Sequence, residues 1–379
     1  MIYLDNAATG GFKPRAVTEV VETVTKYLCA NPGRSGHSLS LTAERLVLSC
    51  REKVADFFSC SFDRVVFTKN CTEALNLAIF GTLKRGGHVI TTTFEHNSVL
   101  RPLFHLAKKG YIELDIVCPT IEKDILEVIK EKITPKTYLI ACTSCSNVTG
   151  KVLPIRKIGE LCKENNLLFL VDGAQGAGHI PLSIKDDHIS MLALAGHKGL
   201  YGIMGSGALV FSDQVDISPL ILGGTGTETF NPDMPLDYPE RLEAGTLSLP
   251  AIASLEEGVK FIKNNLFHFS EQIEKTTEKI IGDLYSIDNI KLYSRPNPAG
   301  IIAFNLKNLS SNKVADVLSN EFDIAVRGGF QCAPLTHKYL NTLETGVVRV
   351  SLAVQNSSSE ISCLTSAVKK IAKGRFFGG

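Results

Sequence analysis

The sequence predicts an α/β protein: a large domain with a mainly parallel seven-stranded sheet, followed by a smaller α+β C-terminal domain. Up to Phe211, short apolar runs alternate with longer segments of helical period, which is typical of a parallel sheet covered by helices. A Gly- and Pro-rich passage then interrupts the pattern, and a different order of helices and strands follows. With 379 residues, the chain is long enough for two domains with sizeable cores.

Short apolar runs are the predicted strands of the sheet. They lie at residues 65–67, 88–92, 113–117, 138–142, 167–171, 191–194 and 208–211. Between them, apolar residues recur at helical spacing, as expected for helices that bury one face. These predicted helices lie at residues 14–28, 39–58, 71–82, 99–109, 121–133 and 154–165. We expect residues 1–250 to form the large domain, with residues 1–14 as an arm that packs near the small domain.

The small domain is expected to span residues 251–379. Its predicted elements are a single long helix at 251–281, a strand at 300–306, a helix at 311–321, a strand at 347–352 and a closing helix at 358–373.

Composition and charge favour a small-molecule ligand. The chain has 40 Lys and Arg against 39 Asp and Glu, which gives no electrostatic reason to expect nucleic acid or an acidic membrane as a partner. Its apolar runs are far shorter than the roughly 20 residues that span a bilayer, and its start lacks the pattern of an export signal. We therefore expect a cytoplasmic protein whose ten cysteines are reduced.

Two polar residues follow apolar runs in a way that indicates a specific cofactor. Asp172 follows LLFLV, and Lys198 follows MLALA within the segment AGHKG. The carboxyl ends of parallel strands are where ligands bind in open α/β sheets. Pyridoxal phosphate (PLP) needs a Lys for its Schiff base and an acidic partner for its ring nitrogen. Alone, the Asp is explained as a helix cap and the Lys as a solvated side chain, but together they favour PLP.

Other ligand classes have less support. The segment KNCTEALNLA opens a helix directly after a strand, so the backbone N–H groups of Cys71 and Thr72 are expected to face an anion such as a phosphate. No P-loop, HExxH or strand-linked GxGxxG motif occurs. Cys142 and Cys145 have CxxC spacing without a second pair, so we expect no metal site.

The sequence resembles a known family across nearly its whole length. The motifs that carry the resemblance are, in order, YLDNAATG, KNCTEALNLA, FEHNSV, SNVTG, VDGAQGAGHI, AGHKGLYG, EAGT, RGGFQCAP and VVRVSLAVQN. They resemble the class V aminotransferases of PLP fold-type I, most closely the cysteine desulfurases and selenocysteine lyases. The short loop between Cys332 and Arg349 is similar to that of the group II enzymes.

The resemblance implies a role for each residue around the cofactor. Lys198 would form the Schiff base with PLP and move the substrate Cα proton. Asp172 would pair with the ring nitrogen, and Gln175 would donate to the ring phenolate oxygen. Asn147 would lie near both cofactor and substrate. His96 would stack on the ring and shuttle a proton at the thiol, although a buried His satisfied by a neighbour is the alternative.

The resemblance also implies how the phosphate is held. His197 matches one phosphate contact, and Thr246 matches a contact that reaches across from the second subunit of a homodimer. Two positions depart from the family pattern, since Ala195 stands where Ser is usual and Cys71 stands where Thr is usual. Each departure removes a side-chain hydroxyl, so the phosphate site is expected to depend more on backbone groups and Thr246.

Two residues of the small domain complete the predicted site. Cys332 matches the cysteine that carries the persulfide, with a packed loop cysteine as the alternative. A thiol beside a cationic cofactor has a lowered pKa and becomes a nucleophile. Arg349 matches the residue that binds the carboxylate of an amino acid, for which a planar guanidinium is suited. Arg327, Arg34 and His37 are expected near the cleft without an assigned role.

The resemblance implies a cysteine desulfurase that converts L-cysteine to L-alanine and transfers the sulfur to Cys332 as a persulfide, and from there to an acceptor protein or small thiol. A selenocysteine lyase would use the same residues on selenocysteine. A cysteine β-lyase or another class V aminotransferase would not need Cys332. A non-catalytic PLP-fold partner subunit is the remaining alternative, and the presence of Lys198, Asp172, His96 and Arg349 argues against it.

Overall fold

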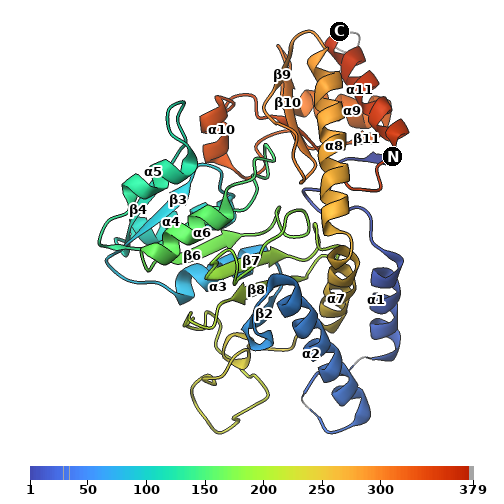
Figure 1. The fold of residues 1–379 in the computed structure, drawn as a ribbon. Coiled ribbons are helices and arrows are strands. Elements are labelled where there is room, and N and C mark those ends of the chain that lie inside the picture. The colour runs from blue at the N-terminus through green and yellow to red at the C-terminus, as the bar shows by residue number, and fades with distance from the viewer. Residues whose placement is uncertain (29, 34, 375–379) are drawn as a thin grey trace.

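A seven-stranded sheet forms the centre of the molecule (Figure 1). The computed structural model describes residues 1–28, 30–33 and 35–374. The strands are ordered β2-β8-β7-β6-β5-β3-β4, and β8 runs opposite to the other six strands. Their bounds are β2 Val65–Thr68, β3 Gly87–Thr92, β4 Ile112–Val117, β5 Thr137–Thr143, β6 Leu168–Asp172, β7 Met191–Ala195 and β8 Gly207–Phe211. The predicted mainly parallel sheet is confirmed.

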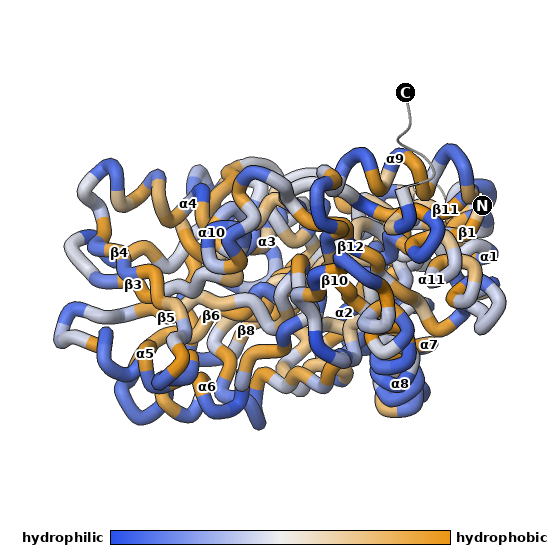
Figure 2. The backbone as a smooth tube through the Cα atoms, turned by 90° about the horizontal axis from the view of Figure 1, so that it is seen from above, coloured by the Kyte–Doolittle hydropathy of each residue, from blue (hydrophilic) through white to orange (hydrophobic). Residues whose placement is uncertain are grey.

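Helices cover both faces of this sheet, which explains why its strands are almost continuously apolar. Along β5, Ile140 and Cys142 join one buried apolar cluster, while Leu139 and Ala141 join the other. The helices of this part are α1 Arg15–Tyr27, α2 Ser38–Phe58, α3 Cys71–Gly81, α4 Asn97–Lys108, α5 Ile125–Lys132 and α6 Ile155–Glu164, with short 3-10 turns at Phe62–Arg64 and Glu240–Leu242. Figure 2 shows that apolar stretches lie along inner strands such as β6 and β8, while hydrophilic stretches lie on outer loops.

The expected single helix at 251–281 is wrong, because the chain forms two helices there. They are α7 Leu249–Lys263 and α8 Leu266–Tyr285. Asn265 separates them: its backbone has φ −125° and ψ −5°, and its side-chain amide donates to the Phe261 carbonyl at 2.7 Å. Helix α7 packs on α1 and α2, whereas α8 contacts a second sheet. Two helices that serve different cores need a break, and Asn is a weak helix former that readily supplies one.

The second sheet is three-stranded, in the order β12-β10-β9, with bounds β9 Ile290–Leu292, β10 Ile301–Leu306 and β12 Val348–Ser351. Helices α8, α9 Ser311–Phe322 and α11 Ser358–Ala372 pack with it around a third apolar cluster. Strand β9 and helix α10 Pro334–Leu340 are too short to be predicted from periodicity. Among the described residues, no helix is both long and apolar enough to cross a membrane.

The first residues of the chain lie against the second sheet's end of the molecule (Figure 1). Strand β1 Ile2–Tyr3 pairs in parallel with β11 Ile324–Ala325, and Asp5 forms a bridge with Ser351. These partners are more than three hundred residues away, so no local pattern predicts the pairing. We keep the division into residues 1–250 and 251–379 as a proposal.

Candidate active site

A cavity of about 100 Å³ lies at the carboxyl edge of the central sheet. Strands β5, β6 and β7 are parallel, so their last residues Thr143, Asp172 and Ala195 meet at one edge, and all three line the cavity. Eight predicted site residues share this lining, namely Cys71, Thr72, His96, Asn147, Asp172, Gln175, His197 and Lys198. Residues from five separate motifs therefore converge on one site.

Asp172 is buried at the end of β6, with a side chain only 4% exposed. Its Oδ1 accepts hydrogen bonds from the Ala174 N–H at 2.9 Å and from the Cys71 thiol at 3.4 Å. Burial, and secondly the Asp172 carboxylate, raise the pKa of Cys71 well above its ordinary value, so that the thiol is a donor to Asp172. These contacts orient the carboxylate and leave Oδ2 available to a ligand.

Lys198 lies in the turn after β7. Burial lowers the pKa of Lys198, and Asp172 and Cys71 partly oppose this shift. No described residue hydrogen-bonds to its Nζ. The turn is tight: a Cβ on Gly196 would lie 2.3 Å from the Ser206 Oγ. A buried amine with a lowered pKa and no internal partner is suited to act as a nucleophile and base.

His96 is the N-cap residue of α4. Its Nδ1 accepts from the Ser98 backbone N–H at 3.1 Å. Because a backbone N–H can only donate, Nδ1 is unprotonated, and the ring proton sits on Nε2. Burial lowers the pKa of His96, which favours this neutral form. The ring therefore has a fixed tautomer.

The anion site predicted at the start of α3 has the expected local geometry. Asn70 caps the helix through its side chain, which accepts from the Glu73 N–H at 3.0 Å, so the N–H groups of Cys71 and Thr72 come first in the helix. The Thr72 Oγ1 lies 2.8 Å from the Ser98 Oγ. Burial lowers the pKa of His197 to about 4, so this ring is a neutral hydrogen-bonding group.

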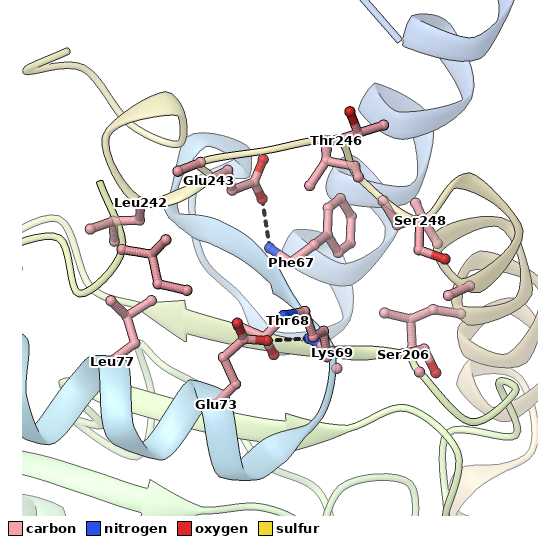
Figure 3. A pocket seen from close by; sticks show the side chains of 18 of the residues that line it. Phe67, Thr68, Lys69, Glu73, Leu77, Ser206, Leu242, Glu243, Thr246 and Ser248 are labelled. Atoms are coloured by element: carbon pink, nitrogen blue, oxygen red, sulfur yellow. Dashed lines mark hydrogen bonds between the residues drawn. The ribbon is translucent and has the colours of Figure 1, made fainter. Parts of the chain in front are cut away.

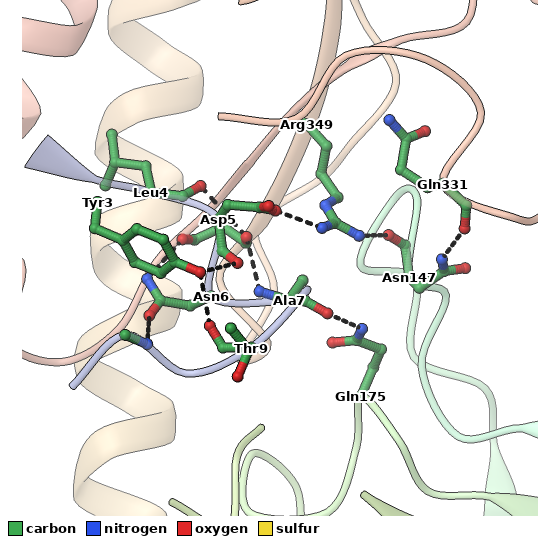
Figure 4. A network of polar contacts seen from close by, with 12 residues as sticks. Tyr3, Leu4, Asp5, Asn6, Ala7, Thr9, Asn147, Gln175, Gln331 and Arg349 are labelled. Carbon is green, nitrogen blue, oxygen red and sulfur yellow. Dashed lines mark hydrogen bonds and ion pairs between the residues drawn. The ribbon is translucent and has the colours of Figure 1, made fainter. Parts of the chain in front are cut away.

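Asn147 connects the cavity to the small domain (Figure 4). Its Nδ2 donates to the Gln331 carbonyl at 2.6 Å, and its own backbone carbonyl accepts from the Arg349 Nη1 at 3.1 Å. Its Oδ1 is buried and has no hydrogen-bond partner among the described residues. Gln175 donates through Nε2 to the Ala7 carbonyl at 2.8 Å. One unpaired amide oxygen therefore remains for a ligand donor.

Arg349 lies on β12 and is only 1% exposed. Its Nη2 contacts the Asp5 Oδ1 at 2.6 Å, while its Nε is buried without a partner in the described part of the chain. Arg349 does not itself line the cavity, but Asn147 joins it to the cavity wall. Figure 4 shows the guanidinium between Asp5 and Asn147.

Cys332 is exposed, on the loop before α10. Its carbonyl accepts from the Asn97 N–H at 2.8 Å, one of the first N–H groups of α4, directly after His96. Gln331 and Cys332 both have left-handed backbone conformations, with φ of 44° and 58°. The predicted nucleophile thus lies on a loop that is bound to the large sheet's helix α4 and to Asn147.

Thr246 lies away from these residues, in the wall of a second cavity of about 160 Å³ (Figure 3). Its Oγ1 accepts from the Asn31 Nδ2 at 3.5 Å. Its predicted role on a second subunit's phosphate stays a prediction. His37 is exposed and caps α2, Arg327 pairs through its backbone with Arg349, and Arg34 lies outside the described residues.

Sequence reasoning missed several residues of the site. Asn70, Ser98 and Thr143 line the cavity, and the helix-cap positions of Asn70 and of His96 with Ser98 were the available signal. Glu95 is fully buried beside them, and burial raises its pKa to about 8. Asp5 has no local signal, because only the fold brings it to Arg349.

The donor set fits PLP. The site offers a free buried amine on Lys198, a carboxylate on Asp172 with one oxygen in use, helix N–H groups at Cys71 and Thr72, and an unpaired acceptor on Asn147. The first three match the aldehyde carbon, the ring nitrogen and the phosphate of PLP, and the Asn147 oxygen can accept from the amine of an amino acid. No cluster of three His, Cys, Asp or Glu side chains that could hold a metal occurs in the described chain.

Known proteins are similar to this chain in both sequence and fold. The model of the aminotransferase class-V family matches residues 2–364. A probable cysteine desulfurase of Methanothermobacter thermautotrophicus is 33% identical, with 98% of this chain and 94% of the relative covered, and one of Pyrococcus abyssi has the same values. The apo structure of a cysteine desulfurase from Thermococcus onnurineus NA1 is 31% identical, has a TM-score of 0.91 and covers 98% of this chain and 95% of that one. The predicted PLP fold type is confirmed, and the chain belongs to the class-V aminotransferase family.

Proposed function

We propose that this protein is a PLP-dependent cysteine desulfurase that converts L-cysteine to L-alanine and carries the sulfur on Cys332. The observation that carries the proposal is the hydrogen bond from the Asn97 N–H to the Cys332 carbonyl. It holds an exposed cysteine next to His96, which lines the cavity of Lys198. Cys332 itself does not line that cavity, but a β-lyase or an aminotransferase has no need for a cysteine at this loop position.

Each residue around the cavity is assigned to one chemical group of PLP. Lys198 would bind the aldehyde carbon, Asp172 would pair with the ring nitrogen, and His96 would stack on the ring. The N–H groups of Cys71 and Thr72, with His197, would bind the phosphate. When bound, PLP supplies an electron sink for the substrate carbanion.

The chain's own groups carry out the remaining steps. Arg349 binds the substrate carboxylate, and Lys198 removes the Cα proton. The Cys332 thiolate attacks the substrate sulfur, the Cβ–S bond breaks, and its electron pair is protonated to give the methyl group of alanine. His96, with its proton on Nε2, donates a hydrogen bond that stabilises the Cys332 thiolate. Lys198 returns a proton to Cα, and the persulfide passes to a small thiol or an acceptor protein.

The test measures alanine, sulfide, pyruvate and ammonia after incubation of the PLP-loaded protein with L-cysteine and a reducing thiol. Alanine and sulfide in equal amounts are expected. Cys332→Ser should lower alanine formation by at least about a hundredfold, while Cys363→Ser, at an exposed cysteine on α11, should leave it unchanged. Pyruvate and ammonia, or full activity of Cys332→Ser, would contradict the proposal. Selenocysteine as the substrate in the same assay tests the lyase alternative.

We further propose a homodimer. The second cavity, which Thr246 lines, includes Leu220 and Ile221, and these two and Leu222 are exposed apolar side chains on the described surface. A second subunit that covers them would bring Thr246 to its phosphate. Sedimentation is expected to give twice the chain's mass of 41.2 kDa, and Thr246→Ala should release PLP faster. A monomer at micromolar concentration would contradict this proposal.

A cytoplasmic location is also proposed. All nine described cysteines are free thiols, as expected in a reducing compartment. Cell fractionation with a cytoplasmic marker would test it.

A further inference from the structure

Asp5 pairs with Arg349, the side chain that binds the substrate carboxylate in the proposed function. The Asp5 Oδ1 lies 2.6 Å from the Arg349 Nη2, and the two side chains are 21% and 1% exposed (Figure 4). The other guanidinium contact is the Asn147 carbonyl. No other carboxylate among the described residues pairs with Arg349. The protein therefore holds an internal carboxylate where an external one is expected.

Charge balance does not favour two carboxylates on this cation. Arg349 is buried, so a single negative partner compensates its charge. A second carboxylate beside the first would bring two negative charges close together in a poorly solvated region, where they repel strongly. One of the two must therefore leave when an amino acid binds, and Asp5 is the partner with access to water.

The contact geometry also favours an exchange. Asp5 makes one hydrogen bond to the guanidinium, while the Arg349 Nε has no partner. A free carboxylate can bond two guanidinium N–H groups at once, which is stronger than a single contact. An incoming carboxylate would thus gain the bond that Asp5 does not make.

Asp5 lies on a segment that connects both parts of the site. Two residues further on, the Ala7 carbonyl accepts a hydrogen bond from the Gln175 side-chain amide. The Ala7 N–H donates to the Ser351 Oγ at 2.9 Å. The backbone is therefore held in place, and only the Asp5 side chain needs to rotate. This makes the exchange a local event that leaves the arm docked.

We propose that Asp5 is a specificity-determining residue, an internal competitor that a substrate carboxylate displaces from Arg349. The inference rests on the proposed function only in assigning Arg349 to the substrate. Ligands without a carboxylate leave the Asp5–Arg349 pair intact and gain nothing from Arg349. Asp5 thereby lowers the affinity for all amino acids but keeps binding dependent on the carboxylate.

The test measures binding of L-alanine, which has no sulfur to lose, to the PLP-loaded protein by calorimetry. Asp5→Asn removes the competing charge and should tighten L-alanine binding by about tenfold. Binding of cysteamine, which has the amine and thiol but no carboxylate, should change by less than about twofold. Tyr3→Phe is the matched control, since it removes the Tyr3 hydroxyl contacts with the Asp5 and Thr9 carbonyls and keeps the carboxylate.

Weaker or unchanged L-alanine binding in Asp5→Asn, or the same gain in Tyr3→Phe, would overturn the proposal. If Asp5→Asn does not fold, Asp5→Ala prepared in acetate answers the same question. Acetate should then compete with L-alanine in Asp5→Ala but not in the unaltered protein, and absence of competition would overturn the proposal. Because these readouts need no turnover, failure of desulfuration leaves them intact, so the two failures are distinguishable.

Discussion

The Lys198 cavity and the Arg349 region are built in different ways. Around Lys198, each side chain stands at the end of a strand or the start of a helix of its own motif, as with Asp172 at the end of β6 and His96 at the cap of α4. Around Arg349, both partners are distant in the sequence: Asp5 lies near the start of the chain, and Asn147 lies about two hundred residues before Arg349. The chemical half of the site is thus encoded locally, and the recognition half depends on long-range docking. Mutations should affect the two halves differently.

Lys198→Ala should have the largest effect of the variants considered. It should lower turnover and leave the folding stability unchanged. Loss of the amine removes the acid and base at Cα, so turnover should fall by at least about a thousandfold. The fold should persist, because no described residue hydrogen-bonds to Nζ and the lowered pKa of Lys198 indicates a group that burial disfavours when charged. Product assays and urea unfolding measure the two effects. Loss of folding in Lys198→Ala would show that this half is not separable from the core.

Glu95→Gln should change how stability depends on pH. Burial raises the Glu95 pKa to about 8, above its ordinary value of 4.5. The stabilising contribution of its protonated form is complete below pH 4.5 and is lost as the pH rises through about 8. Glu95→Gln should remove this loss, so that its free energy of unfolding changes less between pH 6 and about 9, by a few kcal/mol. Urea unfolding at several pH values measures it, with Glu113→Gln at an exposed site as control.

If both variants show the same pH dependence, the Glu95 carboxyl is not protonated in the folded protein. In that case the buried acid beside His96 would need a cation or a water as its partner instead.

Ser351→Ala should have the smallest effect of these variants. It should change only the region around Arg349. The Ser351 Oγ accepts from the Ala7 N–H at 2.9 Å, and its loss leaves that buried donor unpaired, at about 1 to 3 kcal/mol of stability. We expect faster proteolysis of residues 1–14 and weaker L-alanine binding, with PLP binding retained. Limited proteolysis and calorimetry measure these, and Ser362→Ala, at an exposed helix position, should change neither. Equal loss of PLP binding would contradict the division into two halves.

Much of the fold was predictable because the sheet is covered on both faces. Strands such as β5 and β6 are apolar except at their ends, so their existence follows from residue type alone. The break at Asn265 was missed because the periodicity of α7 and α8 continues across it, and only their packing on different cores separates them. Elements as short as β1 and β11 have no periodicity to detect and exist because they pair with each other.

By itself, the sequence determined that Asp172 stands at a strand end and that His96 and Cys71 stand at helix starts, and the pairing of β5, β6 and β7 then brought the strand ends to one cavity. Only the tertiary structure decided the contacts of Arg349 and Cys332. Asp5 contacts Arg349, which is more than three hundred residues away in the sequence. The Asn97 N–H donates to the Cys332 carbonyl, which comes from another part of the chain. Backbone geometry acts over a few residues, whereas buried charges and helix-end donors take whichever partner the fold brings to them.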